Sequence, residues 1–140
     1  MTKITHGTIA AGHHKTAEAG IEMFRRGGNA FDAATAAMLA SFVTESALTS
    51  AGGSGFLLAH TNQNENILFD FFSQTPRQKR YINDLNFYPI EVVYGDAAQE
   101  FHIGLGSIAV PGNLAGVFHI QKKLGRLPFK AIAEPAIHYA

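Results

Sequence analysis

The chain has no cysteine and no tryptophan among its 140 residues, and its eleven basic residues balance its eleven acidic ones. Without cysteine there is no disulfide framework, no thiol nucleophile and no thiolate metal site. A balanced charge argues against a general nucleic-acid surface or a surface for acidic membranes. We therefore expect neither a nucleic-acid partner nor a membrane partner.

Long apolar runs are also absent, and the N-terminus lacks the charged-then-apolar pattern of a signal peptide. A transmembrane helix needs about 20 consecutive apolar residues. The closest candidate is the alanine-rich stretch at 30–43, which Asp32 and Thr35 interrupt. These absences predict no membrane span and favour a cytoplasmic location.

The seven histidines do not have the spacing of a metal site. His13 and His14 are adjacent, and neighbouring side chains do not converge easily on one ion. No H-x-x-x-H pattern or cluster of histidine with carboxylates recurs. The sequence therefore predicts no metal ion and no cofactor.

The first third of the chain predicts two helices around a Gly-Gly break. Apolar residues at intervals of three and four predict a helix over Lys15–Arg26, after a short strand at Thr8–Ala11. Gly27 or Gly28 provides the left-handed backbone that ends this helix.

The second helix is predicted over Ala30–Thr44. Asn29 is its N-cap, and Asp32 is placed to accept hydrogen bonds from amides of the first turn. Its sequence is apolar nearly all round, which is typical of a buried helix. Because alanine is its most frequent residue, neighbouring layers are expected to approach it closely on both sides.

Further along the chain, Phe56–Thr61 and Ile67–Phe72 predict two strands, and the NQNEN sequence between them predicts the turn of a β-hairpin. Residues 73–88 mix charged and aromatic residues without a period, which predicts an irregular, partly exposed loop. A domain boundary at 73–90 and a single large loop are both compatible with this composition. The EVVYG sequence at 91–95 is a candidate short strand.

Two more helices are predicted at the C-terminal end. The first runs over Pro111–Gly125 and ends at its glycine. The second begins at Phe129 and extends to Ala140, with an interruption or offset at Pro135.

Two segments carry a resemblance to a known family. They are AAGHHKTAEAGIEMFRRGGNAFDAATAAMLASFVTESALTSAGGSGFLL at 10–58 and SIAVPGNLAGVFHIQKKLGRLPF at 107–129. Together they resemble the gamma-glutamyltransferase family, through the Gly-Gly-Asn-Ala-x-Asp-Ala-Ala run and the Val-Pro-Gly-x-x-Ala-Gly run. The resemblance extends from about residue 7 to residue 140.

This resemblance implies an α+β fold, the N-terminal portion of a four-layer αββα sandwich of the N-terminal-nucleophile hydrolase type. Residues 1–140 would be a partial domain from the start of the large subunit. In that family the precursor cuts itself, and the new N-terminal threonine of the small subunit is the nucleophile, with its own α-amine as base.

The family transfers a gamma-glutamyl group from glutathione or a related donor to an amino acid, a peptide or water. The segment with the nucleophilic threonine lies downstream of the part matched here. No catalytic residue is therefore expected in this chain, which should be inactive alone. Its partners would be the donor, the acceptor and the remainder of the same precursor.

One departure from the family concerns the donor site. The family carries an R-E-T-A-P segment whose arginine holds the α-carboxylate of the donor. When that segment is aligned on Pro76, the arginine position falls on Phe72, which cannot form a bidentate ion pair. Arg77 and Arg80 follow closely and are candidates for a shifted carboxylate contact; Arg77 and Arg80 also fit a solvated charge run. A donor other than an ordinary α-amino acid is the other explanation.

Glu45 is a third candidate for substrate binding. It follows the alanine-rich helix, where the helix dipole disfavours a carboxylate. Pairing with Arg25, Arg26 or a downstream arginine would compensate for this, and a place in or near the substrate pocket is the other interpretation.

The glycines of the AGGSGF sequence, Gly52, Gly53 and Gly55, fit either a tight helix-to-strand turn or a backbone lining of the catalytic centre. A phosphate cradle is disfavoured, because the helix-loop-strand order is the reverse of a P-loop. For the whole chain, the alternative to part of an enzyme is a catalytically inactive homologue or a standalone association domain. The altered arginine position motivates that alternative.

Overall fold

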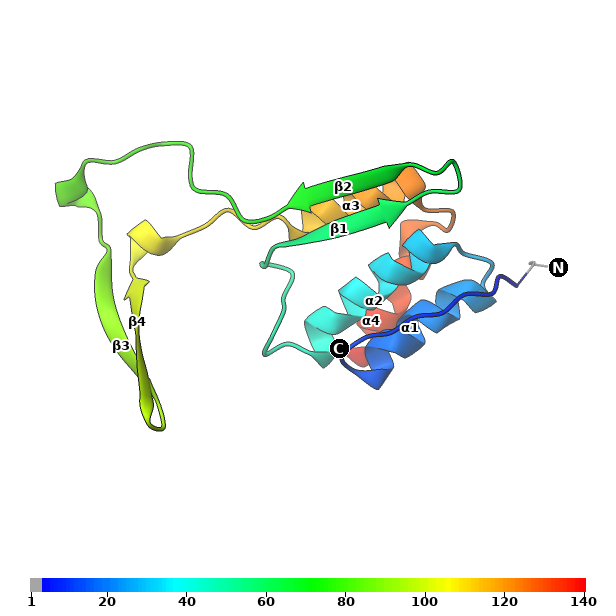
Figure 1. Cartoon of the computed structure of the whole chain (residues 1–140), viewed down its shortest axis with the longest axis horizontal. Coiled ribbons are helices and arrows are strands. Elements are labelled where there is room, and N and C mark those ends of the chain that lie inside the picture. The colour runs from blue at the N-terminus through cyan, green and yellow to red at the C-terminus, as the bar shows by residue number, and fades with distance from the viewer. Residues whose placement is uncertain (1–3) are drawn as a thin grey trace. The chain divides into compact units, whose positions relative to one another are not determined.

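The computed structural model describes residues 4–140, which form two units (Figure 1). The first unit comprises the chain up to residue 72 together with residues 111–140, and the second comprises residues 73–110. Helices and antiparallel strands give the chain the expected α+β class. Within the described residues, every helix is too short or too polar to cross a membrane.

The two N-terminal helices agree closely with the prediction. Helix α1 spans His14–Arg25, and Gly27 follows it with a φ of 82°, the left-handed backbone that favours glycine. Helix α2 spans Ala30–Thr44. The side chain of Asn29 accepts hydrogen bonds from two first-turn amides, and the side chain of Asp32 accepts one from the Asn29 amide. This reciprocal arrangement is a capping box.

The predicted strand at Thr8–Ala11 is wrong. Those residues have no regular secondary structure and pair with no strand. The segment instead runs beside α1 (Figure 1), where the Thr5 amide donates to the Phe24 carbonyl at 3.0 Å. Ile9 packs against the helical core. The apolar pattern in this segment therefore serves contact with a helix and not a sheet.

The predicted hairpin is confirmed. Strand β1 (Gly55–His60) pairs antiparallel with β2 (Asn66–Phe71), and Leu57 lies opposite Phe69. One face of this hairpin packs on helix α3 (Asn113–Leu124).

Helix α4 (Phe129–Tyr139) is continuous, so the predicted interruption at Pro135 is wrong. A proline inside a helix removes one backbone hydrogen bond. Here the proline is buried, so its apolar packing offsets that loss.

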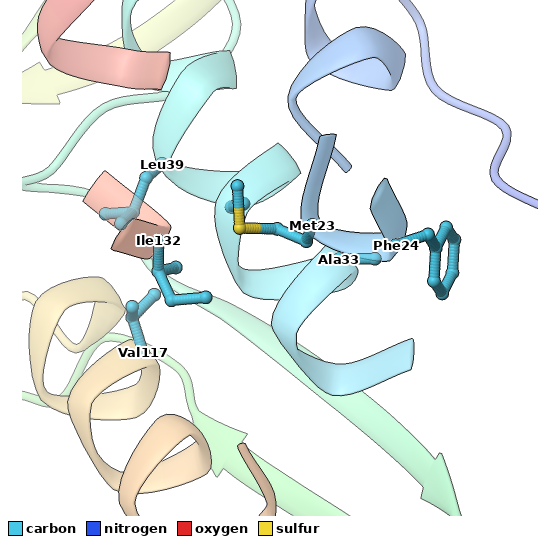
Figure 2. Packing of buried hydrophobic residues seen from close by; sticks show 7 residues of the cluster. Met23, Phe24, Ala33, Leu39, Val117 and Ile132 are labelled. Atoms are coloured by element: carbon cyan, nitrogen blue, oxygen red, sulfur yellow. The ribbon is translucent and has the colours of Figure 1, made fainter. Parts of the chain in front are cut away.

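Helix α2 is the centre of the first unit, since it packs against α1, α3 and α4. Its alanines Ala33 and Ala36 are almost completely buried and let the other helices approach. The resulting core cluster is drawn in Figure 2 and consists of Met23, Phe24, Ala33, Ala36, Leu39, Val117 and Ile132. The prediction of a small-residue helix packed on several sides is confirmed.

The second unit is built on a hairpin of β3 (Tyr88–Tyr94) and β4 (Ala97–Ile103). The predicted short strand at 91–95 is the latter part of β3, but β4 was not predicted. Strand β4 has only two large apolar side chains, too few for a clear period of two. Two short 3-10 turns flank the hairpin, Ile82–Asp84 and Leu105–Ser107.

Candidate functional site

The two sequence segments that carry the family resemblance meet at the carboxylate of Asp32. This side chain is completely buried. It accepts hydrogen bonds from the Asn29 amide at 2.7 Å, from Gln121 Nε2 at 2.7 Å, and from the Arg126 and Leu127 amides at 2.9 and 3.1 Å. The carboxylate thus joins the start of α2 to the connection between α3 and α4.

Neighbouring polar groups reinforce this junction. Asn29 Nδ2 donates to the Leu124 carbonyl at 2.7 Å, and Thr35 Oγ1 donates to Gln121 Oε1 at 2.9 Å. The predicted capping role of Asn29 and Asp32 is therefore confirmed. Both side chains also form hydrogen bonds with residues 121–127, which the sequence did not indicate. Gln121 was missed, because a single glutamine on an otherwise amphipathic helix gives no distinctive signal.

Glu45 lies at the C-cap of α2 and is half-buried. Its carboxylate accepts a hydrogen bond from Thr16 Oγ1 at 2.7 Å, and Thr16 belongs to the first turn of α1. Gly12 leaves the carboxylate room, because a Cβ there would collide with Glu45. The first turn of α1 has no acidic residue of its own, so Glu45 supplies the negative charge that the start of α1 favours.

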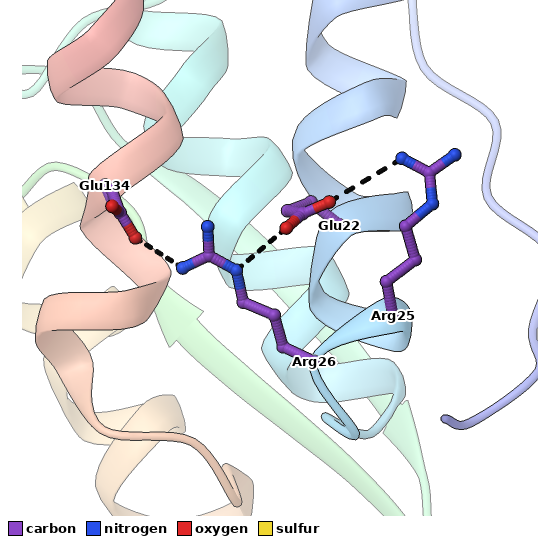
Figure 3. Close-up of polar contacts among 4 residues, drawn as sticks. All are labelled: Glu22, Arg25, Arg26 and Glu134. Atoms are coloured by element: carbon purple, nitrogen blue, oxygen red, sulfur yellow. Dashed lines mark hydrogen bonds and ion pairs between the residues drawn. The ribbon is translucent and has the colours of Figure 1, made fainter. Parts of the chain in front are cut away.

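The suggested pairing of Glu45 with Arg25 or Arg26 is wrong, because both arginines pair elsewhere (Figure 3). Arg26 Nε donates to Glu22 at 3.0 Å, and its Nη1 donates to Glu134. Arg25 Nη1 lies 3.6 Å from Glu22. The hydrogen bond from Arg26 lowers the pKa of Glu134 and, reciprocally, raises the pKa of Arg26.

The glycine-rich loop between α2 and β1 is fastened to the start of α3. The amides of Gly112 and Asn113 both donate to the Gly53 carbonyl at 3.1 Å. Asn113 is buried, and its Nδ2 donates to the Ser50 carbonyl at 2.7 Å. A Cβ at Gly53 would lie 2.9 Å from that nitrogen, so the close approach requires glycine. This geometry is the tight turn that was one of the two predictions for this loop.

Phe72, where the resemblance expects an arginine, carries an aromatic ring stacked on Phe56 at 5.3 Å. Its amide donates to Asp70 Oδ1 at 3.0 Å. The chain therefore presents an aromatic pair just after β2, at the position where the resemblance implied an arginine.

Arg77 and Arg80 lie on the exposed loop before β3. Arg80 lines a pocket of 280 Å³, whereas Arg77 is not among its lining residues. The other residues of that pocket are Pro76, Asp84, Leu85, Asn86, Leu105, Gly106 and Ile108. Asp84 is a second charged group that the sequence did not single out. Within residues 4–140, no group of three or more histidines and carboxylates is arranged to hold a metal ion.

Comparison with known proteins agrees with the motifs. A family profile described as gamma-glutamyltranspeptidase matches residues 16–140. Glutathione hydrolase 2 of Arabidopsis thaliana is 30% identical over 131 residues, which cover 94% of this chain and 21% of that protein. The glutathione hydrolase proenzyme of Pseudomonas aeruginosa is 28% identical, over 96% of this chain and 23% of its own length.

A solved structure, that of gamma-glutamyltranspeptidase from Helicobacter pylori, matches with a TM-score of 0.74 and 27% identity. The match covers 100% of this chain and 38% of that one. The chain spans about a fifth of the length of the two curated relatives, 21% and 23%. Because the family profile covers nearly all of it, the chain belongs to the gamma-glutamyltranspeptidase family.

Proposed function

We propose that this chain is the N-terminal part of a gamma-glutamyl acyltransferase or hydrolase whose nucleophilic threonine lies in polypeptide outside these residues. The two curated relatives described above are named a glutathione hydrolase and a glutathione hydrolase proenzyme, and the chain corresponds to about a fifth of the length of each. The partner that completes the site would be the remainder of the same precursor.

The observation that carries this proposal is the exposed face of the β1–β2 hairpin. Phe56, Leu58 and Leu68 are 58%, 73% and 63% exposed, although the opposite face of the same strands is packed on helices. Strands that are apolar on both faces are typical of a sheet covered on both sides. A second sheet from the rest of the precursor would cover this face and complete a four-layer sandwich.

In the proposed reaction, the threonine attacks the gamma-glutamyl carbonyl of glutathione or a related donor, and its α-amine takes the hydroxyl proton. The amide bond of the donor then breaks, the proton passes to the departing amine, and the gamma-glutamyl group stays on the threonine as an ester. The acyl group then passes to an amino acid, a peptide or water. This chain would supply the scaffold and part of the donor pocket. Arg77 or Arg80 would contact the α-carboxylate of the donor, because Phe72 cannot. Glu45 is the remaining candidate for the pocket wall.

The test is a denaturing gel of the full-length protein, followed by N-terminal sequencing of any smaller fragment. A fragment that begins with threonine, together with release of the leaving group from a gamma-glutamyl anilide, supports the proposed reaction. An uncleaved, inactive product would instead favour the catalytically inactive homologue or association domain, the alternative that Phe72 motivates.

A further inference from the structure

We propose that the exposed segment Arg77–Arg80 is a recognition site for a serine protease with acidic specificity pockets, which hydrolyses the peptide bond between Arg80 and Tyr81. The segment has the sequence Arg-Gln-Lys-Arg, with three positive charges in four residues. Between Asp70 and Asp84 the sequence has no acidic residue, so these charges are not offset locally. The site lies wholly within the second unit.

The first argument is the contrast with the other basic pairs. The sequence has three pairs of adjacent basic residues, at 25–26, 79–80 and 122–123. The first pair lies at the end of α1 and the third in the last turn of α3. A protease binds its substrate as an extended strand through main-chain hydrogen bonds, so a helical site has to unfold before it is cleaved. The pair at 79–80 lies instead in an exposed, irregular connection that follows β2 (Figure 1).

The second argument concerns the backbone of this connection. Within the part of the chain that the structure describes, the backbone of residues 75–80 forms no hydrogen bond with another backbone group. Just before it, Gln74 exchanges two backbone hydrogen bonds with Val110, at 3.0 and 2.7 Å. Just after it, the Asp84 amide donates to the Tyr81 carbonyl at 3.0 Å. The main-chain groups between these two anchors are therefore available to a protease, and exposed loops are preferred sites of proteolytic nicking.

The third argument concerns the side chains. Among the described residues, none of Arg77, Lys79 and Arg80 forms an ion pair. A carboxylate in the primary specificity pocket of a trypsin-like protease selects a basic residue directly before the cleaved bond, the position of Arg80. Further carboxylates of an acidic protease cleft would attract Lys79 and Arg77, the second and fourth residues before the bond. After the bond, Tyr81 and Ile82 are 85% and 82% exposed and are therefore free to enter apolar subsites.

The cleavage itself is an acyl transfer followed by hydrolysis. The protease serine attacks the Arg80 carbonyl, and the protease histidine passes the serine proton to the departing Tyr81 amine. Water then releases Arg80 from the serine, so the products are a carboxylate at Arg80 and an ammonium group at Tyr81. The two fragments should remain associated, because the core cluster in Figure 2 combines Met23 from the first fragment with Val117 and Ile132 from the second.

The test is limited digestion of the full-length protein with furin, a serine protease that requires arginine at the first and fourth positions before the bond. We expect N-terminal sequencing to identify Tyr81 as the first new N-terminus. Arg80→Gln and Arg77→Gln should each slow this cleavage tenfold or more. Lys122→Gln is the matched control, because it removes a positive charge from a helical basic pair, and it should be cleaved at the wild-type rate. Thermal melting of each variant establishes that the fold is retained.

A synthetic peptide of residues 72–86 measures cleavage of the same sequence without the fold. Cleavage of the peptide but not of the folded protein would overturn the proposal, because the site would then be covered in the full-length protein. An uncleaved peptide would overturn it as well, since the sequence itself would not be recognised. A first cut at another basic pair, or equal rates for wild type and Arg77→Gln, would contradict recognition of this segment.

This cleavage is distinguishable from the self-cleavage of the proposed function. A fragment that begins at Tyr81 arises from the added protease, whereas a fragment that begins with threonine forms without it. Formation of the threonine fragment with an intact bond between Arg80 and Tyr81 overturns only the protease site. Cleavage before Tyr81 without a threonine fragment supports the protease site and removes the proposed reaction.

Discussion

At the scale of single residues, the buried carboxylate of Asp32 is the polar group on which the first unit depends most. Removing a carboxylate from water is costly unless hydrogen bonds replace the lost hydration. Asp32 obtains these from the Asn29 amide at the start of its own helix, from the Arg126 and Leu127 amides and from Gln121 Nε2. Because Gln121, Arg126 and Leu127 are distant in the sequence, the charge connects α2 to the α3–α4 connection.

Asp32→Asn should therefore be strongly destabilising although it preserves the shape of the side chain. The amide has only one accepting oxygen, and its NH₂ group would face other donors. We expect the free energy of unfolding to fall by roughly 3 kcal/mol. Urea denaturation measures this, with Glu18→Gln as a control for the same chemical change at an exposed position. Equal effects of the two substitutions would contradict the role of Asp32.

At the scale of helices and strands, α3 approaches β2 so closely that a glycine is required. Gly116 is buried in α3, and a Cβ there would collide with Cβ, Cγ and Cδ1 of Phe71. In an exposed helix, replacing glycine by alanine stabilises by about 1 kcal/mol. Gly116→Ala should instead destabilise by about 1–3 kcal/mol, because the ring or the helix must shift.

Chemical denaturation checks the sign of the Gly116→Ala effect. Lys122→Ala is the control, as it also places alanine on α3 but at an exposed position. If Gly116→Ala stabilised the protein, the close packing of α3 on β2 would be contradicted. Combining it with Phe71→Leu should recover part of the loss, since the collision involves that ring.

The ion pair between Arg26 of α1 and Glu134 of α4 gives a prediction on pH. Arg26 holds the pKa of Glu134 below its ordinary value of 4.5. A lowered carboxyl pKa in the folded state contributes stability above the unfolded pKa, and this contribution is lost as the pH falls through the folded pKa. Glu134→Gln should therefore be slightly less stable than wild type at pH 7, and the difference should vanish in strong acid.

Because Glu134 is exposed, the same difference should also shrink at high salt. Urea midpoints of wild type and Glu134→Gln at pH 7 and in acid, each with and without added salt, measure both effects. A difference that persisted in acid would show that Glu134 acts through packing and not through its charge.

The agreement between sequence and structure is best where the signal is local. Asn29, Asp32 and Gly27 define the break between α1 and α2 by the chemistry of their own side chains or backbone, and the predicted bounds of α2 are correct. The failures depend on partners that sequence does not reveal. The segment at 8–11 packs beside α1 instead of joining a sheet, and Pro135 is tolerated because its surroundings bury it.

The candidate site shows the same limit. Arg77 and Arg80 were suggested through the resemblance, but only the folded loops distinguish them, since Arg80 lines a pocket and Arg77 does not. Asp84 carried no sequence signal, because its relevance comes from lying on the same pocket wall. The position of Glu45 is explained only by the structure, in which Thr16, at the start of α1, donates a hydrogen bond to its carboxylate.

At the scale of the whole molecule, the exposed sheet face distinguishes a self-sufficient domain from part of a larger one. A contiguous apolar face is unfavourable in water and favours association. If the remainder of the precursor covers this face, the apolar residues of the face should promote self-association of the isolated 140-residue chain. In the full-length protein, the same residues should be needed for formation of the cleaved fragment. The two contexts therefore predict opposite effects of the same substitutions.

The double variant Leu58→Thr/Leu68→Thr tests this, because the two leucines lie opposite each other on the exposed face and threonine retains a preference for strands. In the isolated chain, sedimentation should show less self-association than in wild type. In the full-length protein, the same variant should reduce the yield of the cleaved fragment, because a buried apolar contact is lost. Ile137→Thr on α4 is the control, since it removes an exposed apolar group elsewhere and should leave cleavage unchanged. Normal cleavage in the double variant would mean that no second layer covers this sheet.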